Sequence, residues 1–66
     1  MTNLQMMRER RQMTQVELAA RSGVTQQAIS KIENGERKNP GIDTMHKLAR
    51  ALRCTVDDLI KEEEEA

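Results

Sequence analysis

Two helix-start signals with a single glycine between them constrain the fold of this chain more than any other feature. Thr14-Gln-Val-Glu17 matches the S/T-x-x-E capping box and predicts a helix that begins there. Gly23 suits the left-handed position that ends such a helix, and Thr25 can cap a next helix that stops at Gly35. The linker is too short for antiparallel packing, so we expect the two helices to cross at a steep angle.

Capping signals and apolar spacing predict three further helices, and no segment shows the alternation of a strand. A first helix is expected over about residues 3–11. Asp43 can cap a fourth helix, and Thr55-Val-Asp-Asp58 is a capping-box variant that opens a fifth. The segment 35–42, which contains Pro40 and two glycines, is predicted to be a loop. The fold class is therefore expected to be all-α, a compact five-helix bundle.

Charge is distributed unevenly along the 66 residues, although the formal net charge is zero. Residues 1–53 carry ten Lys and Arg against five acids, a balance of +5, whereas residues 54–66 have a balance of −5. The basic body favours a polyanionic partner. The glutamates near the C-terminus oppose the helix dipole, so we predict one domain over residues 1–61 and a frayed acidic tail over 62–66.

Composition argues against several classes of protein. The chain has no Phe, Tyr or Trp, which argues against single-strand binding by base stacking. Cys54 has no partner for an internal disulfide and suits a small core position, and no apolar run approaches the roughly 20 residues of a membrane span. His46 has no second ligand at useful spacing, so no metal and no cofactor are expected. The single cysteine and the lack of a spanning run predict a cytoplasmic protein. With no nucleophile–base pair, the protein is not expected to be an enzyme.

The helix that follows Thr25 has an unusually polar outward side. At about 100° per residue, Ile29 and Ile32 lie on one side, and polar residues share the opposite arc. Glutamine offers a donor and an acceptor that match adenine N6 and N7 in the major groove. On an arbitrary helix such an arc is most often only solvated, but between these capping signals it favours base reading. The arc comprises Gln27, Ser30, Lys31 and Asn34, with Gln26 at the first turn.

Residues 4–60 resemble the phage-repressor or Cro-like family of helix-turn-helix proteins, often called XRE-type regulators. The resemblance implies a lambda-repressor-like DNA-binding domain whose helix-turn-helix spans residues 15–34 and whose third helix enters the major groove. The matching text is Met7-Arg8, Thr14-Gln15, Glu17-Leu18-Ala19, Gly23-Val24-Thr25, Ile29-Ser30, Ile32-Glu33-Asn34-Gly35 and Val56-Asp57-Asp58-Leu59.

Site residues follow from this resemblance. Gln26, Gln27 and Lys31 are the candidates for base reading. Gln15 looks like the phosphate-contacting glutamine of the family, at a helix N-terminus that favours anions. Arg8 would form an ion pair that ties the first helix to the end of the third. The remaining backbone-contacting or supporting residues are Thr25, Ser30, Asn34, Arg37 and Lys38. The expected partner of Arg8 is Glu33, in a partly buried ion pair with a structural role.

Several positions depart from the family pattern. Gly41 provides no side chain in the loop where some phage repressors reach the minor groove with arginine. Gln12 stands where many relatives have glycine, which costs about 1 kcal/mol if that position is left-handed. Arg53-Cys54 replaces the common Gly-Val before the last helix. Val16 lies where charged residues are usual, and we expect it to be exposed.

The predicted function is sequence-specific binding of double-stranded DNA by a homodimeric transcriptional repressor. Two copies would place their recognition helices about 34 Å apart on a pseudo-palindromic operator in the nucleoid. Val56, Leu59 and Ile60 are the predicted dimer surface, although they also suit the core. An alternative is an antitoxin-like or protein-interaction module of the same fold, and a third is a DNA-binding half that works with a separate sensor subunit.

Overall fold

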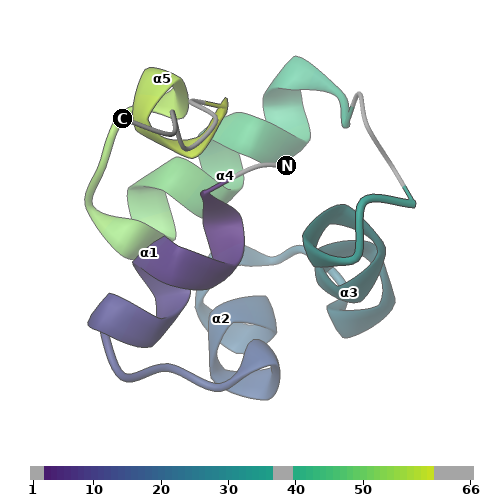
Figure 1. Cartoon of the computed structure of the whole chain (residues 1–66), viewed down its shortest axis with the longest axis vertical. Coiled ribbons are helices and arrows are strands. Elements are labelled where there is room, and N and C mark those ends of the chain that lie inside the picture. The colour runs from purple at the N-terminus through teal and green to yellow at the C-terminus, as the bar shows by residue number, and fades with distance from the viewer. Residues whose placement is uncertain (1–2, 37–39, 61–66) are drawn as a thin grey trace, which may run out of the picture.

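The computed structural model describes residues 3–36 and 40–60. Within these ranges the chain is all-α and contains no strand, as predicted. Arg37, Lys38 and the predicted tail 62–66 lie outside the described residues. Figure 1 shows the helices, which are α1 (Leu4–Arg10), α2 (Gln15–Ser22), α3 (Gln26–Glu33), α4 (Ile42–Leu52) and α5 (Val56–Ile60).

The predicted caps set the start of α2 and of α3. Thr14 Oγ1 accepts a hydrogen bond from the Glu17 amide at 3.1 Å, and the Glu17 carboxylate accepts one from the Thr14 amide at 2.9 Å. Gly23 then ends α2 with φ of 78°. Thr25 Oγ1 accepts from the Ala28 amide at 3.1 Å and so caps α3. The orientation of α3 is thus fixed within a few residues of the end of α2.

The cap predicted for the fourth helix is wrong. Gly41 occupies the N-cap position of α4, and Asp43 lies inside the first turn without a side-chain capping bond. Residue 42 is already helical, so the carboxylate comes two residues too late to cap. Asp43 still places negative charge at the positive end of the helix dipole.

Two tight turns use left-handed residues that carry a side chain. Gln12 follows α1 with φ of 57°, and Arg53 follows α4 with φ of 56°. In each turn an amide reaches back five residues: the Met13 amide donates to the Arg8 carbonyl at 3.1 Å, and the equivalent bond follows α4. A residue other than glycine is strained in this conformation by roughly 1 kcal/mol, as expected for Gln12.

The core is aliphatic and lies where the helices meet. Leu18 of α2 and Ile29 of α3 are both fully buried, and α2 packs against α3 and α4. Figure 1 shows α3 at one flank of the molecule, with α4 running behind α1. None of the helices in the described ranges is long and apolar enough to cross a membrane. The buried apolar residues are Leu4, Leu18, Val24, Ile29, Ile32, Met45, Leu48, Ala49, Leu52 and Leu59.

Candidate nucleic-acid interface

The outward side of α3 is polar, exposed and unbonded. Gln27, Lys31 and Asn34 are exposed, as is Gln26 at the first turn, and Ser30 is half-buried. None of these five side chains forms a hydrogen bond or ion pair with any residue that the structure describes. Their donors and acceptors are therefore available to a ligand that lies along α3.

The inward side of α3 is held rigidly. Ile29 is fully buried and Ile32 is 1% exposed, so the helix cannot rotate without exposing both. Thr25 is exposed, but its hydroxyl is engaged in the cap of α3. The side chain of Thr25 therefore supports the first turn, where Gln26 and Gln27 project.

Glu33, the last residue of α3, is a buried carboxylate that pairs with Arg8 of α1. Arg8 Nε donates to Glu33 Oε2 at 2.8 Å and Arg8 Nη2 donates to Oε1 at 3.1 Å, so the ion pair is bidentate. The two side chains are 12% and 3% exposed. The hydrogen bond to Glu33 is the main cause that raises the pKa of Arg8, so the guanidinium stays charged.

Two further contacts extend this pair into a network. Arg8 Nη1 donates to the Met13 carbonyl at 2.7 Å, which ties the turn after α1 to the pair. Gln15 Nε2 donates to Glu33 Oε1 at 3.0 Å, which ties the first turn of α2 to the end of α3. The carboxylate of Glu33 thus has three charge-assisted or polar donors around it, as a buried charge requires.

Gln15 makes a contact with Glu33 that the sequence did not predict. The resemblance marks it as a phosphate contact, whereas the structure places its amide nitrogen on Glu33. An amide nitrogen carries two protons, so one remains for a second acceptor. Nothing in the sequence indicates the contact, because residues 15 and 33 meet only through the crossing of α2 and α3.

Of the other predicted site residues, the structure describes Asn34 but not Arg37 or Lys38. Asn34 follows α3 directly and is exposed at the same end as Glu33. Arg37 and Lys38, predicted to form the rest of a phosphate clamp, lie outside the described residues. Val16 is 59% exposed beside Gln15, as expected for its departure from the family pattern.

Cys54 and His46 do not form a site within the described ranges. No group of three or more His, Cys, Asp or Glu residues there could hold a metal ion. Cys54 is half-buried against the core, and desolvation, with a smaller contribution from Asp58, raises the pKa of its thiol. A raised pKa leaves little thiolate at neutral pH, which makes this cysteine a slow nucleophile.

Comparison with known proteins gives one family and several bacterial relatives. The family model described as "Helix-turn-helix" matches residues 4–59. The HTH-type transcriptional repressor RghR of Bacillus subtilis is 44% identical over 57 residues, which are 86% of this chain and 42% of that protein. The uncharacterized HTH-type transcriptional regulator y4dJ of Sinorhizobium fredii is 39% identical over 59 residues, 89% of this chain and 75% of that protein. This chain therefore spans less than half the length of RghR and most of the length of y4dJ.

Proposed function

Because this chain belongs to the phage-repressor-like (XRE-type) helix-turn-helix family, we propose that it regulates transcription by binding double-stranded DNA with α3 in the major groove. The observation that carries the proposal is the contrast within α3. Its inward side is buried and anchored through Glu33, and its outward polar side chains have no partner among the described residues. A rigid helix with unbonded amides suits the recognition of base edges.

In this proposal each outward residue has a role set by its chemistry. Gln26 and Gln27 read adenine through paired donor and acceptor contacts, and Lys31 donates to guanine O6 or N7. Asn34 and the second amide proton of Gln15 bind phosphates and so fix the register of α3 in the groove. Thr25 and Ser30 support α3, and Arg37 and Lys38 extend the phosphate contacts.

We further propose that the protein acts as a homodimeric repressor on a pseudo-palindromic operator. A single recognition helix contacts few base pairs, and two helices about 34 Å apart give a more useful specificity. Ile60 of α5 is 53% exposed and Val56 is half-buried, so these two residues offer an apolar surface to a second copy. Leu59, predicted to belong to the same surface, is instead fully buried in the core. The repressor name of RghR supports the direction of regulation.

A selection from randomised DNA duplexes with the purified protein tests this function most directly. We expect enrichment of two inverted half-sites about 10 base pairs apart, centre to centre, and binding that weakens steeply as salt increases. Recovery of no common sequence, together with salt-independent binding, would refute base reading by α3.

The dimer is tested separately by sedimentation of single variants. Ile60→Glu is expected to leave a folded monomer, because the charge would be buried at the proposed interface. Ile42→Glu is the matched control, since Ile42 is 63% exposed at the start of α4 and lies outside that interface. A wild-type monomer on operator DNA, or equal effects of both variants, would exclude α5 as the dimer surface.

A further inference from the structure

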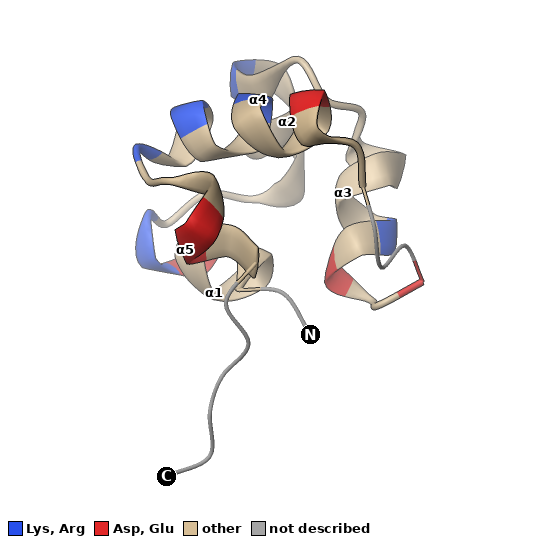
Figure 2. Cartoon of the chain, turned by 90° about the horizontal axis from the view of Figure 1, so that it is seen from above, with Lys and Arg blue, Asp and Glu red and all other residues tan. Residues whose placement is uncertain are grey.

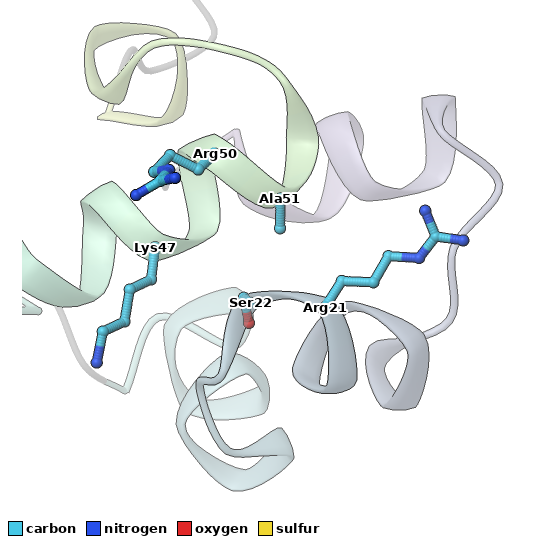
Figure 3. A pocket seen from close by; sticks show the side chains of 5 residues that line it. All are labelled: Arg21, Ser22, Lys47, Arg50 and Ala51. Atoms are coloured by element: carbon cyan, nitrogen blue, oxygen red, sulfur yellow. The ribbon is translucent and has the colours of Figure 1, made fainter.

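A hollow of about 300 Å³ lies between the end of α2 and the middle of α4. It is lined by Arg21, Ser22, Lys47, Arg50 and Ala51, which Figure 3 shows. Two of the lining residues are small, and the other three carry positive charge. We propose that this hollow is a second anion site that binds linked phosphate groups, independently of base reading by α3.

Glu17 and Asp43, each one turn before a cation of the hollow, form no ion pair with that cation. None of its three cations forms an ion pair with a residue that the structure describes. Glu17, one turn before Arg21 on α2, feels the charge of Arg21, but its carboxylate accepts its hydrogen bond from the Thr14 amide. Asp43, one turn before Lys47 on α4, likewise makes no ion pair.

Like charges on one side of α4 favour an anion. Lys47 and Arg50 are three residues apart, a spacing that places two cations on neighbouring positions of a helix. Figure 2 shows the blue basic positions along α4 and the red acidic positions on the separate helix α5. Such a pair repels itself in the free protein, and a bound anion relieves that repulsion.

The arrangement of the cations indicates the shape of the ligand. Figure 3 shows Arg21 and Lys47 extending toward opposite sides, with Ser22 and Ala51 between them. Ser22 Oγ accepts a hydrogen bond from the Val24 amide at 3.1 Å, so its hydroxyl proton is left to donate. Cations that spread along an open hollow suit several phosphates in a row, as in a nucleic-acid backbone or a free oligophosphate, better than one compact anion.

The hollow is separate from the proposed reading face. Gln15 joins the α3 network at the first residue of α2, whereas Arg21 and Ser22 are at the last turn of this eight-residue helix. At 1.5 Å per residue the two ends of α2 are about 10 Å apart. None of the outward side chains of α3 lines the hollow.

The test follows the backbone amide signals of Ser22 and Ala51 by NMR in the full-length protein. Sodium pyrophosphate is titrated against sodium chloride at equal ionic strength, and a short DNA duplex of arbitrary sequence is titrated in a parallel sample. The Lys47→Gln, Arg50→Gln double variant removes two cations of the hollow. The Arg10→Gln, Arg11→Gln double variant is the matched control, since both arginines are exposed near the end of α1.

Saturable shifts at Ser22 and Ala51 are expected, with affinity falling about two- to fivefold for each hollow cation removed and unchanged in the control. Shifts with pyrophosphate would identify a free oligophosphate as the ligand, and shifts with the duplex alone would identify a DNA backbone. Shifts that chloride reproduces, or that both double variants weaken equally, would overturn the site. The pyrophosphate titration contains no DNA, so it stands or fails separately from recognition by α3, and the Gln27→Ala variant must retain it.

Discussion

The two sides of α3 use polar residues in opposite ways. Glu33, on the buried side, accepts three hydrogen bonds from Arg8 and Gln15. Gln27 and Lys31, on the outward side, form none with any described residue. The same helix thus has one polar side chain that is hydrogen-bonded within the protein and others that bond to no described residue. Hydrophobicity alone does not distinguish the two kinds. The difference predicts that changes on the buried side alter stability, and changes on the outward side alter ligand binding.

The largest effect is expected on the buried side, for Arg8→Met. Loss of the guanidinium leaves the Glu33 carboxylate, which is 3% exposed, without a charged partner. Breaking such a pair costs about 3–5 kcal/mol, a large part of the stability of a domain this small. Urea unfolding followed by circular dichroism measures the loss.

Two further variants show whether the loss comes from the unpaired charge. Arg10→Met, at an exposed position of the same helix, is expected to change stability by less than about 0.5 kcal/mol. The Arg8→Met, Glu33→Met double variant is expected to recover much of the loss, because both charges leave together. A double variant as unstable as Arg8→Met would show that packing, rather than the charge, sets the effect.

The next effect is expected on the outward side, for Gln27→Ala. Loss of a bidentate contact with adenine should cost about 1–3 kcal/mol of binding on the selected operator. The melting temperature should not change, because Gln27 bonds to no described residue. Fluorescence anisotropy on operator and arbitrary duplexes measures both affinities. An equal loss on both duplexes would show that Gln27 contacts the backbone rather than a base.

The turn that carries the buried network offers a smaller, stabilising change. Gln12 has a left-handed φ of 57° next to Met13, whose carbonyl accepts from Arg8. Gln12→Gly removes the strain of the side chain and costs backbone entropy, for a net gain of up to about 1 kcal/mol. Thermal unfolding measures it. Gln5→Gly, inside α1, should instead destabilise by roughly 1 kcal/mol, and a loss at both positions would contradict strain at Gln12.

The sequence predicted the local features of this fold well. Thr14, Glu17 and Thr25 act through contacts within three residues, so their spacing alone determines the caps. The five helices follow from these signals and from apolar periodicity. The cap was assigned to Asp43 rather than Gly41 because glycine can also occupy an N-cap, and errors of one or two residues at helix ends are common.

Features that depend on tertiary contacts were less accessible. The contact of Gln15 with Glu33 depends on how α2 and α3 cross. The hollow between α2 and α4 joins residues 21–22 with residues 47–51, which share no local motif. Base-reading roles on α3 came from the family resemblance and remain a proposal, since exposure shows availability and not the ligand.

The smallest effect on stability is expected at Glu17, which is exposed at the start of α2, in contrast to the buried Glu33. The hydrogen bond that Glu17 accepts from the Thr14 amide lowers the pKa of its carboxyl below the ordinary value of 4.5. A depressed folded-state pKa contributes stability that is present above the unfolded value and is lost as pH falls through the folded value. Glu17→Gln keeps an acceptor for the cap but does not titrate, so its stability should approach that of the wild type below about pH 4.

Urea unfolding of both proteins between about pH 7 and pH 3 measures this difference. Thr14→Ala is the control, because it removes the hydroxyl but leaves the Thr14 amide that bonds Glu17. Because the hydroxyl also contributes to the lowered pKa of Glu17, the control should keep only part of the pH dependence of the wild type while being less stable throughout. A gap between wild type and Glu17→Gln that does not change with pH would mean that the capping carboxylate acts only as a neutral acceptor. In that case the start of α2, and with it the position of Gln15, would depend on the hydrogen bonds of the cap and not on the charge of Glu17.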